Sequence, residues 1–247
     1  MHRRTVALVL LAGLVALSGC AGLTDSSPTD TTSNVDADAD AVQADTLDAM
    51  TTVTSYEFSA DLQQDLGNVQ TDIDLTGVVN TTAERMYQKS DATATRGDQS
   101  TSATTKSYIA NDTAYIHSQG VWQTRPAPER TWNNTPVDRQ VQFLTGAEVT
   151  VLNKTTVDGV ETYALSVQPD PERVAGYIEN QSSVGGDATV DSVSVTQYVA
   201  VDTHRIRKAT LDMSATIQGQ TIDQTLTITF SEYGTETDIT VPDEATN

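Results

Sequence analysis

Few residues of this sequence have types and spacing that could do chemistry, and the first is a lone thiol. Cys20 is the only cysteine among the 247 residues, so no disulfide can form within the chain. His117 and His204 are the only histidines after the first twenty residues, and they lie far apart in the sequence. Zinc sites use clustered cysteine and histidine ligands, so we expect neither a metal site nor a cofactor.

Catalytic motifs are also missing from the sequence. It contains no G-x-S-x-G elbow, no H-E-x-x-H and no glycine-rich phosphate loop. Its 34 acidic residues are so widely spread that no two carboxylates stand out as an acid and a base. We therefore expect a protein that is not an enzyme, with no catalytic residues.

The first nineteen residues have the layout of an export signal. Met1–Arg4 is short and basic, Thr5–Leu17 is an apolar stretch, and Ser18 and Gly19 are small. The apolar stretch is too short to span a bilayer as a mature helix and is typical of a signal peptide that is removed. The Arg3–Arg4 pair partly resembles a twin-arginine signal, so the sequence leaves open whether export follows the Sec or the Tat route.

The end of this signal gives the lone thiol a role. Leu17-Ser18-Gly19-Cys20 resembles a lipobox, which implies a thioether-linked lipid on the Cys20 sulfur and cleavage before that residue. We therefore expect a protein that is held by its lipid on the extracytoplasmic face of the cell membrane. The alternative is an incidental or buried cysteine that follows an ordinary signal.

Residues 20–44 read as the lipidated Cys20 followed by a disordered acidic tether. They are rich in Ser, Thr and Asp and contain few large apolar side chains, so they cannot bury enough surface to offset the entropy of ordering. Asp36, Asp38 and Asp40 alternate with alanine and could suggest calcium. An EF-hand loop also needs a central glycine and a final glutamate, which favours a solvated spacer here.

The charge excludes one class of partner. The chain has 34 acidic and 14 basic residues, and removal of Arg3 and Arg4 with the signal would change the net charge from −20 to −22. Without a basic stripe to neutralise phosphates, we expect no binding to nucleic acid. The scarcity of lysine and the spread of acidic residues resemble a haloarchaeal protein, in which salt screens the repulsion. The alternative is an acidic surface that meets a cationic partner.

Five asparagines lie in Asn-x-Ser/Thr sequences, each a possible glycan acceptor in an exported chain. They are Asn80, Asn111, Asn133, Asn153 and Asn180. Asn111 is the best single candidate, because Ala110-Asn111-Asp112-Thr113 has the composition of a hairpin turn.

From residue 45 to 247 we expect a single domain whose hydrophobic pattern has mostly a period of two. Tyr56, Phe58, Ala60 and Leu62 would share one face of a strand, with polar residues between them. The same alternation predicts antiparallel strands at about 56–63, 71–79, 84–90, 104–110, 113–118, 148–156, 161–168, 191–201, 209–217 and 221–230.

Three segments have a helical period instead. The first is Ala41–Val53, the second follows Thr135 and Pro136, and the third follows Asp170 and Pro171. None is long enough to be stable alone, so each must dock on the sheet. The sequence thus predicts an α+β domain with a large, curved antiparallel sheet and about three short helices packed on its concave side. Four long strands should end the chain.

Three local motifs add a family resemblance. Tyr115–Trp122, the late hairpin Tyr198–Arg205, and Phe230–Gly234 before Ile239–Pro242 are similar to segments of the LolA/LppX group. The resemblance implies an unclosed β-barrel that wraps around a few helices and encloses a lipid cavity. It implies no catalytic residues. LolA ferries lipoproteins between two membranes, and that activity should not transfer to a haloarchaeal protein.

The alternating strands supply candidates for the lining of such a cavity. They are Tyr56, Phe58, Leu62, Leu211, Met213, Ile217, Leu226, Ile228 and Phe230. The segment between Trp122 and Trp132 carries Arg125 and Arg130. It is either a connection whose tryptophans pack on the sheet or the rim of the cavity, where the two arginines would meet an anionic headgroup. We expect a carrier or binder of a lipid or a lipoprotein chain. The alternatives are a sensor or adaptor that uses the same fold to bind a protein, and a passive glycosylated surface lipoprotein.

Changing Cys20 to Ser tests the lipid anchor. Serine has no thiol to form the thioether, so Cys20→Ser should leave the precursor uncleaved or release the protein from the membrane fraction. Fractionation and immunoblotting would measure both. Behaviour identical to that of the unmodified chain would contradict lipidation at Cys20.

Overall fold

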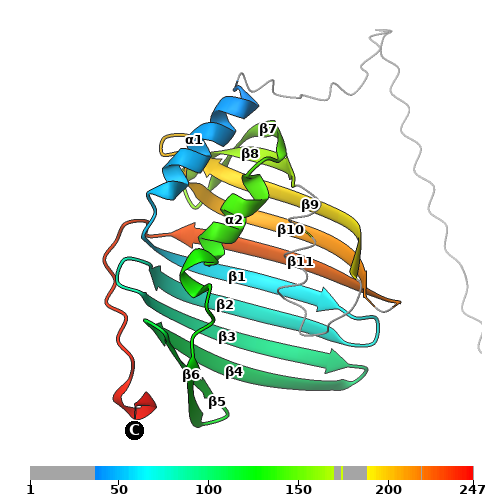
Figure 1. The fold of residues 1–247 in the computed structure, drawn as a ribbon. Coiled ribbons are helices and arrows are strands. Elements are labelled where there is room, and N and C mark those ends of the chain that lie inside the picture. Colours follow the sequence, from blue (N-terminus) through cyan, green and yellow to red (C-terminus); the bar gives the residue numbers. More distant parts are fainter. Residues whose placement is uncertain (1–36, 170–173, 175–187, 218, 247) are drawn as a thin grey trace, which may run out of the picture. The chain divides into compact units, whose positions relative to one another are not determined.

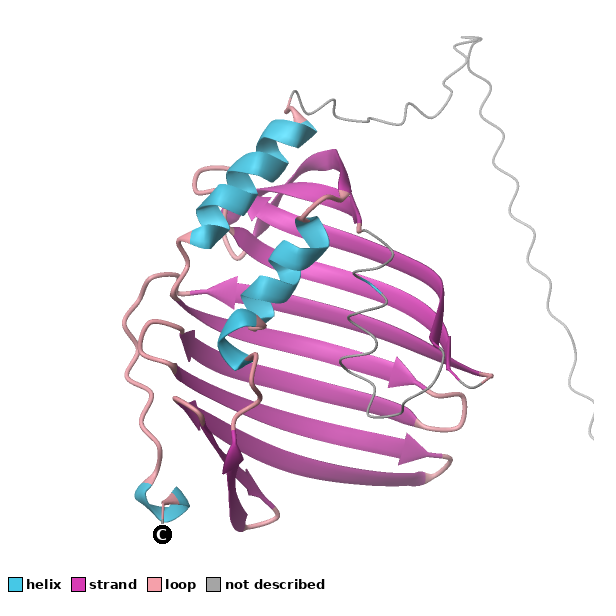
Figure 2. Cartoon of the chain, in the orientation of Figure 1, coloured by secondary structure: helices cyan, strands magenta, loops and turns pink. Residues whose placement is uncertain are grey.

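Eleven strands form one antiparallel sheet in the computed structural model, which describes residues 37–169, 174, 188–217 and 219–246 (Figures 1 and 2). Residues 33–247 make one compact unit. The strands are β1 (Ser55–Asp65), β2 (Gln70–Asn80), β3 (Arg85–Arg96), β4 (Gln99–Ala110), β5 (Thr113–Ser118), β6 (Val121–Pro126), β7 (Glu148–Val157), β8 (Val160–Gln168), β9 (Ala188–Ala200), β10 (Ile206–Ile217) and β11 (Gln220–Ser231).

The strand order shows how the two halves of the chain meet. It runs β6-β5-β4-β3-β2-β1-β11-β10-β9-β8-β7, so each half is a meander and the halves join where β1 pairs with β11. The edges are β6 and β7, which do not pair with each other, and the sheet is therefore open. This confirms the predicted large antiparallel sheet, because every strand expected from the period of two falls within one of these elements, to within one residue at residues 84 and 201.

Three differences from the predicted elements stand out. Residues 239–242 form no strand, although Ile239 is buried, so three rather than four strands end the chain. The segment between Trp122 and Trp132 is not all connection, because its residues 123–126 belong to β6 and pair with β5. The described residues contain two α-helices, and the third predicted helix lies outside them except for Val174, which is helical and buried.

The first helix, α1 (Ala39–Thr51), starts within the stretch that composition assigned to the tether. Its N-cap is Asp38, whose Oδ1 accepts hydrogen bonds from the amides of Asp40 (3.0 Å) and Ala41 (3.4 Å). A run of alternating aspartates thus contains a helix start. Val42, Thr46 and Met50 form the buried stripe of the helix.

The second helix, α2 (Pro136–Leu144), begins where the sequence predicts. The amide of Asp138 donates to the Thr135 hydroxyl (3.4 Å), and the Asp138 carboxylate accepts from the Thr135 amide (2.8 Å). This reciprocal pair is a capping box, and Pro136 occupies the first turn, where its missing N–H costs nothing. Val137, Phe143 and Leu144 turn toward the core.

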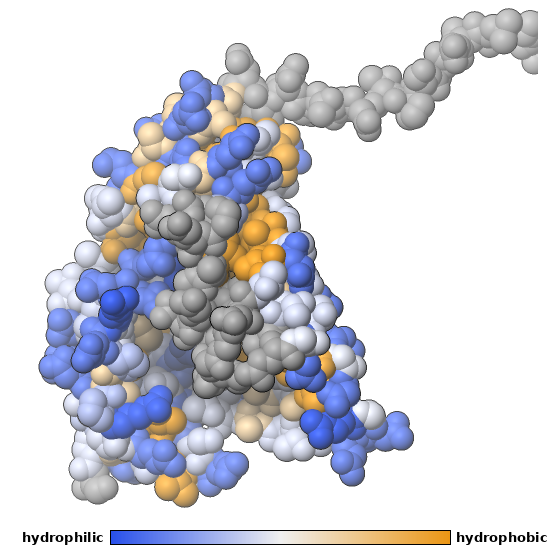
Figure 3. All heavy atoms as spheres, turned by 45° about the vertical axis from the view of Figure 1, so that its right-hand side comes forward, coloured by the Kyte–Doolittle hydropathy of each residue, from blue (hydrophilic) through white to orange (hydrophobic). Residues whose placement is uncertain are grey.

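Both helices lie over the same face of the sheet (Figure 1). Their buried side chains form one cluster with those of the central strands, including Tyr56, Phe58, Leu165, Leu211 and Phe230. Residues that alternate with these strand residues point to the opposite, outer face, which is rich in Thr and Ser along β10 and β11. In the view of Figure 3, which still includes part of the helix-bearing side, the coloured surface of the molecule is mostly hydrophilic or neutral, and hydrophobic residues gather in small areas.

The two edge strands are built differently from the central ones. β6 has six residues and ends at Pro126, which has no amide to donate. β7 has a register shift between Val151 and Asn153, and Lys154 follows on the same strand. Short length, proline, bulges and lysine are all features that keep an edge from pairing with another sheet.

No helix among the described residues has both the length and the hydrophobicity needed to cross a bilayer.

A glycine in β2 leaves room for an aromatic ring of the neighbouring strand β1. A Cβ atom at Gly77 would come within 2.4 Å of Phe58 Cε1 and within 2.7 Å of the Tyr87 carbonyl oxygen. Real side chains do not approach so closely, so Gly77 provides the space in which the Phe58 ring packs.

Gly77→Ala should therefore destabilise the domain by about 1–3 kcal/mol, the usual cost of overpacking. The sheet backbone at Tyr87 must shift as well as the Phe58 ring. Chemical denaturation would measure the loss. Gly67→Ala is a useful comparison, because a Cβ there meets no atom within 4 Å and only its positive φ of 78° opposes the change. Equal stability of Gly77→Ala and the unmodified chain would contradict this packing.

Candidate functional site

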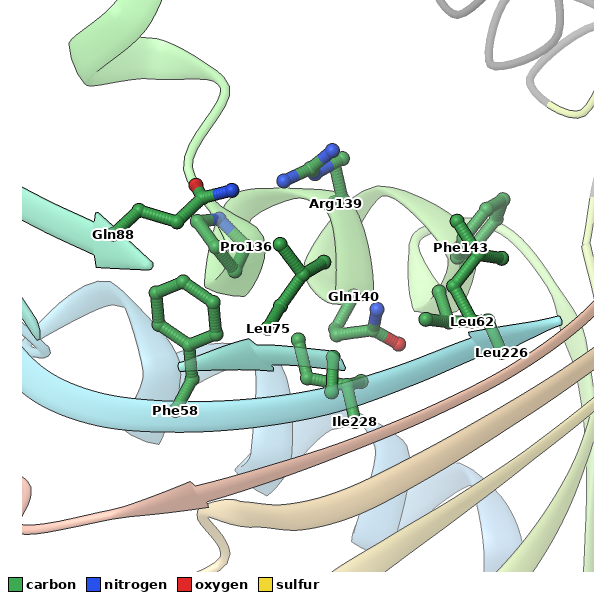
Figure 4. Close-up of a pocket in the computed structure, with 11 residues that line it drawn as sticks. Phe58, Leu62, Leu75, Gln88, Pro136, Arg139, Gln140, Phe143, Leu226 and Ile228 are labelled. Carbon is green, nitrogen blue, oxygen red and sulfur yellow. The ribbon is translucent and has the colours of Figure 1, made fainter. Parts of the chain in front are cut away.

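An apolar cavity lies between α2 and the centre of the sheet (Figure 4). Its volume is about 210 Å³, and it is partly open to solvent. Strands β1, β2, β3 and β11 form its floor, and α2 forms its roof. The residues that line it are Phe58, Ala60, Leu62, Leu75, Gln88, Pro136, Arg139, Gln140, Phe143, Leu226 and Ile228.

The floor follows from the strand register. Ala60 lies opposite Ile228 on one side and Leu75 on the other, and Leu62 lies opposite Leu226. These side chains share one face, because facing residues on paired strands point the same way. The floor of the cavity is therefore a continuous aliphatic surface across β2, β1 and β11.

The roof is fixed at three points by hydrogen bonds. The amide of Val137, in the first turn of α2, donates to the Tyr56 hydroxyl at 3.3 Å. The side-chain amide of Gln43 on α1 donates to the Leu144 carbonyl at 2.7 Å, at the other end of α2. Gln197 Nε2 on β9 donates to the Gln140 carbonyl at 2.9 Å. The first two contacts satisfy backbone groups that a short helix leaves unpaired at its ends, and the third reaches a carbonyl in the middle of α2.

Polar groups at the cavity are few and come from two elements. Arg139 and Gln140 project from α2, and Gln88 projects from β3 beside Pro136 (Figure 4). Arg139 forms no ion pair among the described residues. A mostly apolar lining with a few polar groups is the usual composition of a site for a small molecule.

The predicted cavity residues separate into two groups. Phe58, Leu62, Leu226 and Ile228 line the cavity. Four other residues that were predicted to line the cavity do not reach it. Tyr56, Leu211 and Phe230 are buried in the core, and Met213 borders a shallower hollow over β9, β10 and β11. Ile217 ends β10, and its side chain lies outside the described residues.

Several lining residues were missed because they come from elements whose docking the sequence does not reveal. Leu75 alternates correctly in β2, but the face that it shares with Leu62 depends on the register. Phe143 and Arg139 lie on α2, and only the position of that helix brings them to the floor. The capping signal at Thr135 locates the helix in the sequence without locating it in space.

The sequons occupy different kinds of position. Asn111 is exposed in the β4–β5 turn with a φ of 50°, and Asn153 is exposed on the edge strand β7. Asn80 ends β2 and accepts a hydrogen bond from the Ala83 amide. Asn133 is exposed, but its sequon threonine is the buried cap Thr135. Asn180 lies outside the described residues, as does Cys20.

The other candidate groups do not gather at the cavity. Arg125 lies in β6, and Arg130 lies just before the 3-10 turn Thr131–Asn133. Trp132 packs against the core cluster and Trp122 against His117, as the packed-connection interpretation expects. His204 Nε2 lies 3.7 Å from an Asp45 oxygen. Among residues in the described ranges, no three His, Cys, Asp or Glu side chains are grouped closely enough to hold a metal ion.

The Tyr56 hydroxyl has an unusual environment. Burial beneath α2 raises the pKa of Tyr56 from 10.0 to about 12, against the opposing effect of its hydrogen bonds. Burial also raises the pKa of Tyr233, whose hydroxyl donates to the Ile206 carbonyl. Just above pH 10, where the phenols of the unfolded chain begin to lose their protons, both hydroxyls are therefore still neutral in the folded chain.

The stability of the domain should therefore fall as pH rises above 10. In the unfolded chain Tyr56 ionises near its ordinary pKa of 10.0, and in the folded chain only near 12, so its contribution is complete below pH 10 and is lost between these values. This shift corresponds to about 3 kcal/mol. Tyr56→Phe removes this dependence and costs about 1–3 kcal/mol at pH 7, because the Val137 amide loses its acceptor. Denaturation midpoints between pH 7 and 12 would measure both effects, and identical slopes for the two chains would contradict them.

Comparisons with known proteins agree with this fold. The structure of LprF from Mycobacterium bovis superposes with a TM-score of 0.55 at 15% identity, over 83% of this chain and 96% of that one. The lipoprotein LppX from Mycobacterium tuberculosis gives a TM-score of 0.48 at 14% identity, over 81% and 99% of the two chains. MucB in its complex with MucA, from Pseudomonas aeruginosa, gives 0.37 at 12% identity, over 84% and 62%.

The likeness to LprF shows that the open sheet and its helices share the fold of that protein. No curated protein matches the sequence significantly. A family match covers residues 38–247, which contain every described helix and strand. The chain therefore belongs to DUF6612, a family of unknown function.

Proposed function

We propose that this protein binds the apolar chain of a lipid, or of a lipoprotein's acyl or isoprenoid group, between α2 and the sheet. The observation that carries the proposal is the cavity itself, whose lining is aliphatic over β1, β2 and β11 and includes three polar residues, Gln88, Arg139 and Gln140. Apolar chains bind such surfaces through burial, at about 0.8 kcal/mol for each methylene group. The LolA/LppX-like fold is consistent with this use of the space beneath the helix.

The size of the cavity limits how the ligand sits. Ordinary small-molecule sites measure about 300–1,000 Å³, whereas this cavity measures about 210 Å³. The cavity therefore holds part of an acyl or isoprenoid chain, and a longer chain requires α2 to move away from the floor. The hydrogen bonds at Tyr56, Gln43 and Gln197 are the contacts that such a movement would break.

The proposed location follows from the sequence. A lipid on Cys20 would anchor the mature chain at the extracytoplasmic face of the membrane, and residues 21–37 would connect the anchor to the domain. We propose a binding protein rather than an enzyme, because the cavity places no nucleophile beside a base. Some of the sequons would carry glycans, with Asn111 and Asn153 the most accessible of those described. The acidic composition would suit high salt.

Mass spectrometry of bound lipids tests this function. The chain from residue 20 with Cys20→Ser, made in a halophilic host and purified in molar salt, should carry one lipid class near equimolar. Leu62→Gln places an amide on the cavity floor and should reduce the bound lipid at least fivefold. Leu152→Gln is the matched control, because Leu152 is 47% exposed on β7.

Two other outcomes would contradict lipid binding. A protein free of lipid, with a cavity that binds no hydrophobic dye, would favour a passive surface lipoprotein. A lipid-free protein that captures one partner on crosslinking in native membranes would favour a sensor or adaptor. Equal lipid content in Leu62→Gln and Leu152→Gln would place the lipid outside this cavity.

A further inference from the structure

The outer face of the sheet carries a row of side chains unlike the rest of the surface. Three of the four lysines of the sequence occur in a single cross-strand row. Across nine neighbouring strands, the row consists of Tyr198, Lys208, Thr229, Ser59, Thr76, Lys89, Lys106, His117 and Trp122.

Two of these lysines, Lys89 and Lys106, place like charges next to each other on paired strands. Lys89 and Lys106 are directly opposite each other on β3 and β4, an arrangement that costs stability when the charges are alike. Asp91 offsets part of this cost through its ion pair with Lys89, at 2.6 Å. Lys106 is exposed and forms no ion pair with any described residue.

Aromatic rings surround these lysines on the same face. The ring centroids of Tyr87 and Tyr108 are 4.8 Å apart, those of Tyr108 and Trp122 are 6.0 Å apart, and those of His117 and Trp122 are 4.9 Å apart. These rings are partly exposed and lie outside the core cluster. We call Tyr87, Lys89, Lys106, Tyr108, His117 and Trp122 the aromatic-lysine patch.

The part of the sheet that bears this patch is the positive end of an acidic protein. From Arg85 to Pro126 the chain has five basic residues and three acidic ones, a net charge of +2, whereas the whole chain has −20. An anionic partner would meet less repulsion at this patch than at the neighbouring outer-face row of Asp61, Asp74 and Asp91 on β1, β2 and β3.

We propose that the aromatic-lysine patch docks the domain on the surface of a bilayer that contains anionic lipids. Tyrosine and tryptophan prefer the membrane–water interface, and basic side chains beside them attract anionic headgroups. A broad sheet face also suits an extended surface better than a small ligand. The eighteen residues between Cys20 and α1 span at most about 65 Å when extended, which lets an anchored domain turn this face to the membrane.

The strand register also shows where the patch lies relative to the cavity. On the inner face, Ser90 of β3 pairs with the floor residue Leu75, and Thr105 of β4 pairs with Ser90. Both strands belong to the part of the sheet that is far from α1 (Figure 1). The patch lies on the opposite face from the cavity, so docking does not require an occupied cavity.

Vesicle sedimentation tests the proposal directly. The chain from residue 20 with Cys20→Ser is mixed with phosphatidylcholine vesicles with or without 30% phosphatidylglycerol, at the lowest salt that keeps its circular dichroism spectrum native. It should bind the anionic vesicles and not the neutral ones. Lys106→Glu should lower the partition coefficient about 25-fold, because each charge near an anionic surface contributes about fivefold. Trp122→Ser should weaken binding without changing the charge.

The matched control is Lys154→Glu, which makes the same change in net charge on the lysine outside the row. It should change the partition coefficient by no more than about threefold. Equal losses in Lys106→Glu and Lys154→Glu, or no binding of the parent chain to anionic vesicles, would overturn the proposal. Binding to immobilised polyglutamate but not to vesicles would overturn it in favour of an acidic protein partner. Leu62→Gln should keep full vesicle binding, so failure of the cavity proposal is distinguishable from failure of docking.

Discussion

The hydrogen bond from the Val137 amide to the Tyr56 hydroxyl holds α2 over the sheet, and the cavity exists only while α2 stays there. A helix of nine residues is not stable alone, so its position must come from contacts with its surroundings. Gln43 and Gln197 supply the other two attachments from α1 and β9. Hydrogen bonds are directional, whereas apolar contacts with the aliphatic floor are not. The three hydrogen bonds can therefore hold α2 in one position without side chains that fill the space between α2 and the sheet.

The helix-covered face changes character along the sheet, and this change limits where an apolar ligand can bind. One cross-strand row runs from Ala209 through Ile228, Ala60 and Leu75 to Ser90 and Thr105. Its aliphatic part ends at β2, where the helices end their cover in Figure 1. Small hydroxyl side chains on β3 and β4 can face water at little cost, so the face needs no third layer there. The apolar part of the proposed ligand would therefore contact mainly β1, β2 and β11.

The sequence predicts the strands well because alternation is a local property. Tyr56, Phe58, Ala60 and Leu62 show their shared face without any knowledge of their neighbours. Residues 239–242 alternate as well, yet both sides of β1 are already occupied by β2 and β11, and Ile239 is buried without joining the sheet. The cavity was predicted only in part for a similar reason. Leu211 and Leu226 look equivalent in sequence, and the docking of α2 decides that one is core and the other is wall.

The two free edges of the sheet have a consequence for how the protein behaves at high local concentration. An open sheet of eleven strands exposes two rows of unpaired backbone groups, which are templates for amyloid-like growth. Here one template is six residues long and stops at a proline, and the other is interrupted by a register shift and followed by a lysine. Proteins crowded side by side on one membrane would meet through these edges more often than proteins free in solution. Their construction therefore lets the open barrel remain open without polymerising.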